Sequence, residues 1–204
     1  MAKLLLTSNG FFTDLIKYQF LRRLEYGLST ISATIITTAS QQKEQNRFAI
    51  KAKDDFIGMG INRVEFTDIE FESPDKLQKY DVIYINGGNP FYLLHHMKRS
   101  GADLILKELS KQNVLIVGVS AGTMVLGPHI EVVRYFTPQM NHVNLEDMRG
   151  LGLTDKILFP HYDREDLFPD FFGKTIEQRL KDFEALKKCE VVRMKDEQSI
   201  FIRI

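Results

Sequence analysis

The sequence has little cysteine, no excess charge of either sign and no long apolar run, and each absence excludes a class of protein. One cysteine among 204 residues excludes an intramolecular disulfide framework and fits a reducing compartment. Lysine and arginine number 27, as do aspartate and glutamate, which argues against nucleic acid or a membrane surface as the main partner. The apolar start, residues 1–7, is too short for a signal peptide or a membrane helix and is typical of a strand. We therefore expect a cytoplasmic protein.

The length of the chain favours one domain. A chain of 204 residues can form one sizeable core, and we find no internal repeat or low-complexity segment in it. We therefore expect residues 1–204 to form a single α/β domain. Cys189 precedes the strand-like pair Val191-Val192, so we expect it to be a buried core thiol rather than a nucleophile.

Apolar strands alternate with amphipathic helices along the chain. We expect strands at residues 4–7, 30–38, 63–66, 81–85, 114–117, 157–159, 190–194 and 199–204. We expect helices at residues 11–26, 41–59, 90–97, 102–110 and 123–126. The apolar spacing predicts that the first two helices bury Phe11, Leu15, Tyr18, Leu21 and Leu24, and Phe48, Ile50, Phe56 and Ile57. This alternation predicts a parallel sheet covered on both faces, which binds ligands at the carboxyl ends of its strands.

The stretch from Val114 to Thr123 carries the strongest functional signal. An apolar strand runs into Gly118-Val-Ser120-Ala-Gly122, and a short helix follows, which is the context of a nucleophile elbow. The two glycines leave room for a sharp turn that exposes the serine hydroxyl. The N–H group of Ala121 can then face a developing oxyanion. The competing interpretation is an ordinary strand–helix turn in which Ser120 only caps the helix.

The loop Asn86-Gly87-Gly88-Asn89 is the second informative stretch, because it also links a buried strand to a helix. Two glycines let the backbone approach another group closely and turn its N–H groups outward. The N–H of Gly88 is therefore a candidate second oxyanion donor beside Ala121. A phosphate-binding loop or a plain turn are the alternatives, although the loop lacks the lysine and the spacing of a P-loop.

A nucleophilic serine needs a base, and histidine is the usual one. Among the five histidines, His161 directly follows an apolar strand and Pro160, which predicts that it lies at the carboxyl edge of the sheet with Ser120. His129, nine residues after Ser120, is the alternative base. A buried structural histidine is the other interpretation of His161.

The residues alone leave the acid of a catalytic triad open. Asp163, Glu165 and Asp166 follow His161, although such a cluster is usually a solvated surface. Asp196 lies between the last two predicted strands, where a hairpin loop could reach the site, but its surroundings are also typical of a plain turn.

Several of these stretches together resemble the peptidase E family of serine peptidases, which includes aspartyl dipeptidases and cyanophycinases. The matching segments cover most of the chain: the N-terminal Leu-Leu-Leu strand, residues 87–94, Gly118 to Gly122, residues 159–162 and residues 175–179. The resemblance implies a three-layer α/β/α sandwich with a mostly parallel sheet, like that of class I glutamine amidotransferases. It also implies Ser120 as nucleophile, His161 as base, and Gly88 with Ala121 as oxyanion hole. A serine in place of that group's cysteine counts against glutamine amide transfer.

The chain departs from the family pattern at two positions. Some members carry an aspartate about fifteen residues after the nucleophile, where this chain has Tyr135. We therefore assign the acid to Asp196, with no family motif behind the assignment. Aspartyl dipeptidases carry an arginine where this chain has Ile176, which cannot pair with a substrate carboxylate, so strict aspartyl specificity is doubtful.

The sequence as a whole predicts a serine peptidase that hydrolyses dipeptides or other small amides through Ser120, His161 and Asp196. The expected partner is a small peptide or amide, with no nucleic acid or membrane involved, and the chain is expected to be a monomer or a homodimer. We expect no metal or organic cofactor. The alternatives are hydrolysis of an ester or isopeptide-like polymer, and a non-catalytic protein that keeps the elbow as a small-molecule binding pocket.

Overall fold

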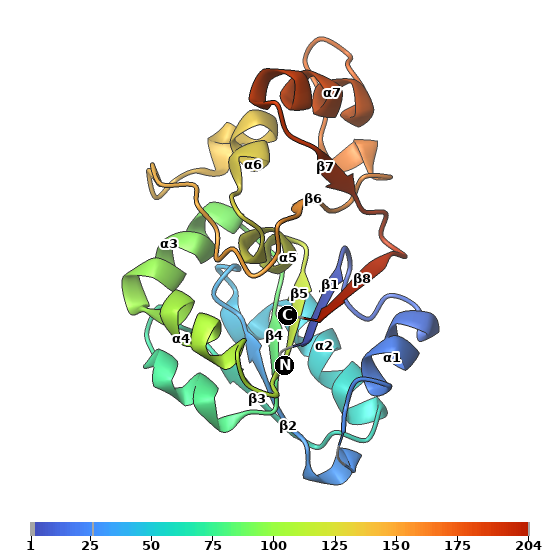
Figure 1. Cartoon of the computed structure of the whole chain (residues 1–204), viewed down its shortest axis with the longest axis vertical. Helices are drawn as coiled ribbons and strands as arrows, with labels where there is room; N and C mark the ends of the chain where they lie inside the picture. Colours follow the sequence, from blue (N-terminus) through green and yellow to red (C-terminus); the bar gives the residue numbers. More distant parts are fainter. Residues whose placement is uncertain (1–2, 26, 204) are drawn as a thin grey trace.

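The computed structural model describes residues 3–25 and 27–203, and its centre is a six-stranded sheet (Figure 1). The strand order is β3-β2-β4-β5-β1-β8. All neighbours are parallel except β1 and β8, which run antiparallel. The strands are β1 (Lys3–Thr7), β2 (Ser32–Ile36), β3 (Arg63–Thr67), β4 (Val82–Ile85), β5 (Leu115–Val119) and β8 (Ser199–Arg203).

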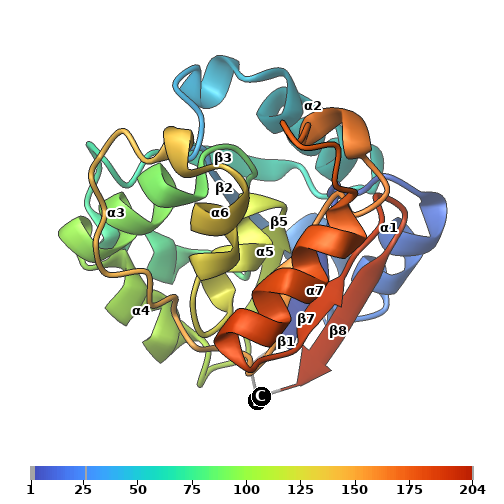
Figure 2. The same cartoon turned by 90° about the horizontal axis from the view of Figure 1, so that it is seen from above.

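Helices cover both faces of this sheet, with α1 and α2 on one side and α3, α4 and α5 on the other (Figure 2). Consecutive side chains of a strand point to opposite faces, so Leu5 packs in the first core while Leu4 and Leu6 pack in the second. The α/β fold with a mostly parallel sheet is therefore confirmed. The helices are α1 (Asp14–Leu21), α2 (Arg47–Gly58), α3 (Pro90–Ser100), α4 (Ala102–Leu109) and α5 (Ala121–Leu126). Short 3₁₀ helices are η1 (Leu28–Thr30), η2 (Lys43–Gln45) and η3 (Pro74–Lys79).

The first helix is shorter than predicted and buries other residues. It begins after Thr13, whose hydroxyl accepts the N–H of Ile16, and it buries Ile16 and Phe20. The side chains of Leu15 and Tyr18 are exposed, so their predicted burial is wrong. The apolar spacing is compatible with two neighbouring helix faces. The face with Ile16 and Phe20 packs on the sheet, and the face with Leu15 and Tyr18 does not. The predicted end at Tyr26 lies outside the described residues, as do Met1 and Ala2 of the predicted N-terminal strand and Ile204 of the last strand.

The predicted second helix consists of two elements, η2 and α2, separated at Asn46, which caps α2 through the N–H groups of Phe48 and Ala49. Phe56 is buried as expected, together with the small residues Ala49 and Ala52. The predicted burial of Phe48, Ile50 and Ile57 is wrong, since all three are exposed. Small side chains let this helix approach the sheet closely, which turns the larger apolar residues outward.

Residues 127–196, here called the cap segment, lie beyond the carboxyl ends of the sheet strands (Figure 1). Inside the cap segment β6 and β7 form a separate two-stranded parallel sheet. In α7, Glu184 and Glu177 accept hydrogen bonds from Arg193 of β7, which ties the helix to the strand pair. The elements are α6 (Glu131–Phe136), η4 (Pro138–Met140), β6 (Ile157–Phe159), η5 (Glu165–Leu167), α7 (Ile176–Lys187) and β7 (Val191–Arg193).

The last two strands do not form the predicted hairpin. β7 pairs with β6, whereas β8 pairs with β1 at the edge of the main sheet. The chain therefore passes from one sheet to the other between residues 193 and 199. Two apolar segments with a polar turn look like a hairpin in sequence, but each strand found a better-buried partner elsewhere.

Two further expectations concern membranes and the cysteine. Among the described residues, 3–25 and 27–203, no helix is both long enough and apolar enough to cross a lipid bilayer. Cys189 is partly buried and packs against the main core rather than lying fully inside it. Burial, with a smaller contribution from Glu184, raises the pKa of this thiol. The protonated form is a poor nucleophile.

Candidate active site

Ser120 occupies a strained turn between β5 and α5. Its backbone has φ 48° and ψ −113°, a combination that residues with a side chain rarely adopt. The Ser120 N–H donates to the carbonyl of Thr7 in the neighbouring strand β1, at 3.1 Å, which holds the turn in place. This geometry is that of a nucleophile elbow, with the side chain presented at the end of the sheet.

Close packing around the G-x-S-x-G motif leaves no room for a side chain at either of its two glycines. A Cβ atom on Gly122 would lie 2.1 Å from the carbonyl oxygen of Ile85, at the end of β4. A Cβ atom on Gly118 would lie 2.8 Å from Cα of Thr123. Any side chain at either position would push α5 away from the sheet and move Ser120 with it.

Gly88 also has a conformation and a position that only glycine permits. Its φ is 145°, and a Cβ atom on it would lie 2.3 Å from the carbonyl oxygen of Ala39. The next residue, Asn89, caps α3 by accepting the N–H groups of Phe91 and Tyr92. The loop thus passes from β4 to α3 against the elbow, and Gly88 and Ala121 line the same cavity as Ser120.

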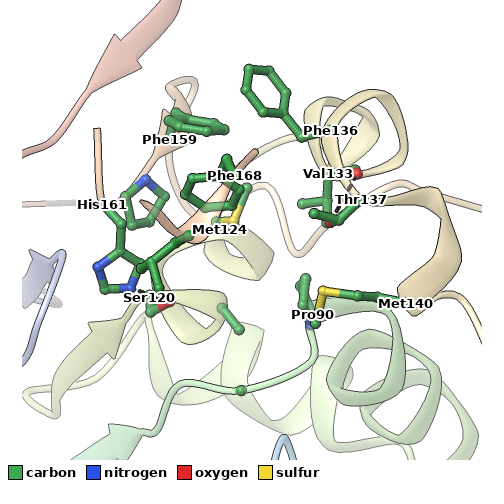
Figure 3. Close-up of a pocket in the computed structure, with 14 residues that line it drawn as sticks. Pro90, Ser120, Met124, Val133, Phe136, Thr137, Met140, Phe159, His161 and Phe168 are labelled. Carbon is green, nitrogen blue, oxygen red and sulfur yellow. Dashed lines mark hydrogen bonds between the residues drawn. The ribbon is translucent and has the colours of Figure 1, made fainter. Parts of the chain in front are cut away.

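His161 lies beside Ser120, and the two side chains face each other (Figure 3). The ring nitrogen Nε2 is 2.9 Å from Ser120 Oγ, and Nδ1 is 2.5 Å from Asp196 Oδ1. An ionised carboxylate only accepts hydrogen bonds, so the proton belongs on Nδ1 and the lone pair of Nε2 faces the serine hydroxyl. The backbone of His161 has φ 57°, the second strained residue of the site.

Asp196 is only 6% exposed and has several hydrogen-bond donors around its carboxylate. Besides His161, Ser8 Oγ donates to Oδ1 at 3.1 Å, Asn9 Nδ2 donates to Oδ2 at 3.3 Å and Arg164 Nη1 donates to Oδ2 at 3.4 Å. A buried carboxylate is tolerated when its oxygens are hydrogen-bonded in this way. The connection from β7 to β8 therefore brings Asp196 to His161, although it is not a hairpin.

Ser8 is a residue of the site that the sequence analysis did not identify. Its hydroxyl accepts the backbone N–H of His161 at 2.8 Å and donates to Asp196, so one side chain links both residues. Ser8 looks like part of an ordinary Ser-Asn-Gly turn in sequence. The available signal was its place directly after β1, since β1 and β5 are parallel and their carboxyl ends meet at one edge.

The alternative candidates have hydrogen-bond partners other than the imidazole of His161. Asp163 accepts the backbone N–H of Asp196 at 3.0 Å, and Glu165 accepts the first N–H of α7, from Ile176, at 3.0 and 3.1 Å. Asp166 pairs with Arg164, and this hydrogen bond lowers the pKa of the carboxyl and raises that of the guanidinium. His129 lies before α6, where its Nδ1 accepts the N–H of Glu131 at 3.4 Å.

A cavity of about 200 Å³ opens beside Ser120 and His161 (Figure 3). Its walls come from the Gly88 loop, the elbow and the cap segment. Neither Tyr135 nor Ile176 lines it: Tyr135 is 38% exposed on α6, and Ile176 is fully buried at the start of α7. The lining residues are Gly88, Pro90, Ser120, Ala121, Met124, Val133, Phe136, Thr137, Met140, Phe159, Pro160, His161, Leu167 and Phe168.

Comparison with known proteins identifies the family of this chain. The model of peptidase family S51 matches residues 4–203. An "uncharacterized peptidase" of Listeria monocytogenes is 32% identical over the whole chain and 95% of its own length. A peptidase E of Streptomyces coelicolor is 31% identical over 53% of this chain and 43% of its own length. The crystal structure of a candidate peptidase E from Listeria monocytogenes superposes with a TM-score of 0.72 at 29% identity, covering 100% of this chain and 99% of that one. The chain therefore belongs to peptidase family S51 and is a peptidase of the serine type.

Proposed function

We propose that the protein hydrolyses dipeptides or other small amides through a triad of Ser120, His161 and Asp196. One observation supports this proposal above the others: a continuous hydrogen-bond chain runs from Ser120 Oγ through the imidazole of His161 to the buried carboxylate of Asp196. The serine at one end of these hydrogen bonds lies at a cavity that is large enough for one side chain rather than for a long peptide.

In the first half of the reaction, Ser120 Oγ attacks the carbonyl carbon of the substrate. The hydroxyl proton moves to Nε2 of His161, and Asp196 stabilises the imidazolium that forms. The tetrahedral intermediate then collapses, the C–N bond breaks, and the proton on Nε2 passes to the leaving amine. The products of this half are a free amine and an ester between Ser120 and the acyl group.

The carbonyl oxygen becomes negatively charged during this attack and needs hydrogen-bond donors. We assign that role to the backbone N–H groups of Gly88 and Ala121, which line the same cavity. Both come from loops that follow neighbouring parallel strands, β4 and β5. One such donor is worth roughly 3–4 kcal/mol in other serine hydrolases.

In the second half, water replaces the amine. His161 Nε2 takes a proton from the water as it attacks the acyl ester, and returns that proton to Ser120 Oγ when the ester bond breaks. The acid leaves and the enzyme is restored. Every step uses only residues of this chain and one water molecule.

The alternative hypothesis, a non-catalytic binding protein, was motivated by Tyr135 and Ile176. It expects Ser120 and His161 to lie beyond hydrogen-bond reach of each other. The distance of 2.9 Å favours the hydrolase instead. Tyr135 packs against Phe183 of α7, with ring centroids 5.6 Å apart, so its position on α6 has a packing role here.

Labelling by diisopropyl fluorophosphate tests the proposal. The wild-type protein is expected to gain one phosphoryl adduct by intact mass, and Ser120→Ala is expected to gain none, because only an activated serine displaces the fluoride. Ser199→Ala is the matched control: Ser199 lies on β8 and donates to Gln19, so this variant should react like wild type. A folded wild-type protein that stays unmodified would contradict the proposed function.

A further inference from the structure

We propose that the cavity beside Ser120 selects substrates with an uncharged apolar side chain, such as leucine, methionine or phenylalanine, on the residue whose carbonyl is attacked. This inference rests on the proposed function and names its substrate class. The cavity begins at Ser120 and at the two candidate oxyanion donors, Gly88 and Ala121. The side chain next to the attacked carbonyl is therefore the part of the substrate that enters it.

Most of the side chains that line the cavity are apolar. Met124 of α5 forms its floor, and Phe136 of α6, Phe159 of β6 and Phe168 surround it (Figure 3). Phe136 and Phe159 have ring centroids 4.5 Å apart, and Phe159 and Phe168 have theirs 5.1 Å apart. Such a cluster of three aromatic rings gives a rigid apolar surface.

Within residues 3–25 and 27–203, no aspartate, glutamate, lysine or arginine side chain lines the cavity. Apart from Ser120 and His161, the polar side chain present is that of Thr137. Its hydroxyl donates to the carbonyl of Val133 in α6, at 3.3 Å. A carboxylate or an ammonium group that entered the cavity would lose its hydration without gaining a charged partner, which is strongly unfavourable.

Arg179 of α7 lies behind this wall and is bonded to the backbone of two of its residues. It is 7% exposed, and its Nη1 and Nη2 donate to the carbonyls of Phe168 and Phe136, each at 3.0 Å. The guanidinium lies 4.0 Å from the centre of the Phe136 ring, and Nε is 3.6 Å from Asp170. Arg179 therefore stiffens two residues of the cavity wall and does not present a cation to the substrate.

The volume of the cavity and the two methionines in its lining suit medium and large apolar side chains. About 200 Å³ is enough for one side chain. Met124 and Met140 both line the cavity, and methionine adapts its shape to different apolar groups. Filling an apolar pocket with additional methylene groups favours a substrate by about tenfold or more.

A panel of α-aminoalkyl diphenyl phosphonates tests the inference without requiring turnover. Each reagent carries one side chain, and Ser120 Oγ forms a bond to phosphorus as phenol leaves. Reagents with leucine, methionine or phenylalanine side chains are expected to modify the wild-type protein at least about tenfold faster than those with aspartate or lysine side chains. Equal rates, a preference for a charged side chain, or no reaction with any of the five would overturn the inference.

Diisopropyl fluorophosphate separates this failure from failure of the proposed function, because it reports the nucleophile without presenting an amino-acid side chain. A protein that reacts with it but shows no apolar preference has the proposed chemistry and a different pocket. A protein that does not react with it lacks the proposed chemistry.

Met140→Arg probes the pocket directly by placing a cation in its wall. The ratio of modification rates, leucine reagent over aspartate reagent, is expected to fall at least about tenfold. Met59→Arg is the matched control, since Met59 is half-buried at the end of α2 on the other face of the sheet. It should leave the ratio unchanged. An unchanged ratio in a folded Met140→Arg would overturn the inference, and the wild-type panel decides it if that variant does not fold.

Discussion

The sheet region, which is residues 3–25 and 27–126 together with β8, and the cap segment contribute different parts of the site. The sheet region is regular, and it supplies Ser120 and Gly88 from the ends of parallel strands. The cap segment has two strands of three residues and long irregular connections, and its two key residues are His161 and, near its end, Asp196. The proposed nucleophile therefore comes from the most regular part of the molecule, and the proposed base and acid come from the least regular part.

The end of β1 joins these two regions. The carbonyl of Thr7 accepts the N–H of Ser120, and the hydroxyl of Ser8 accepts the N–H of His161. Both bound residues have positive φ, at 48° and 57°. Strained conformations persist only where the surroundings hold them. Two consecutive residues of one buried strand end thus hold the proposed nucleophile and the proposed base in register.

The strongest test of this comparison replaces one side chain in each region by alanine. Ser120→Ala and His161→Ala are each expected to lower kcat by about 10⁶, and the double variant is expected to be no worse than either, because the two residues act as one unit. Steady-state hydrolysis of a dipeptide measures all three. Losses that multiply in the double variant would show that the two regions act independently. His129→Ala should keep activity near the wild-type level.

Asp196→Asn should have the next largest effect. The amide can donate to Nδ1 of His161 and so favours the wrong tautomer, which is expected to lower kcat by about 10⁴ while the fold stays intact. Measuring kcat together with thermal unfolding separates these two outcomes. Asp166→Asn changes an exposed carboxylate that pairs with Arg164, and it should keep near-normal activity. The reverse ranking of these two variants would move the acid to Asp166.

Ser8→Ala tests the junction itself and should have a smaller effect. Loss of the hydroxyl removes one bond to His161 and one to Asp196, and the resulting misplacement of the base is expected to lower kcat roughly 10–100-fold with little change in KM. Ser110→Ala is matched in burial, since Ser110 is 7% exposed and donates to the carbonyl of Lys107. Equal kcat values for both variants would argue against a positioning role of Ser8.

Glu184→Gln tests how the cap segment is held, and should have the smallest effect. The hydrogen bond from Arg193 lowers the pKa of Glu184 below its ordinary value of 4.5. A lowered pKa in the folded protein contributes stability above pH 4.5, and this contribution is lost as the pH falls through the lowered pKa. We expect Glu184→Gln to be less stable than wild type by about 1 kcal/mol at pH 7, and the difference to shrink below the lowered pKa.

Thermal unfolding of wild type and Glu184→Gln at neutral and acidic pH measures this difference. Glu190→Gln is the control. Glu190 is exposed and directly precedes β7, so this variant should behave like wild type at each pH. A stability difference for Glu184→Gln that does not depend on pH would contradict the assigned ion pair.

The sequence allowed the alternation of strands and helices, the elbow and the Gly88 loop to be predicted, because each depends on local apolar runs and glycine positions. Prediction from the sequence was wrong where two local interpretations were equally good. The apolar residues of α1 were compatible with two helix faces, and the exposed Leu15 and Tyr18 belonged to the one not chosen. The last two strands were compatible with a hairpin, and their real partners lie far away in sequence.

The sequence by itself determined that this chain forms a mostly parallel α/β sheet with Ser120 on a strained turn at its carboxyl edge. Local packing requires the glycines around that serine, so a short motif is enough to identify it. Only the tertiary structure brought Asp196 and Ser8 to His161, and only it formed an apolar cavity from the Gly88 loop, the elbow and the cap segment. Those contacts join residues up to 188 positions apart, and long-range contacts of this kind have no local pattern from which they could be predicted.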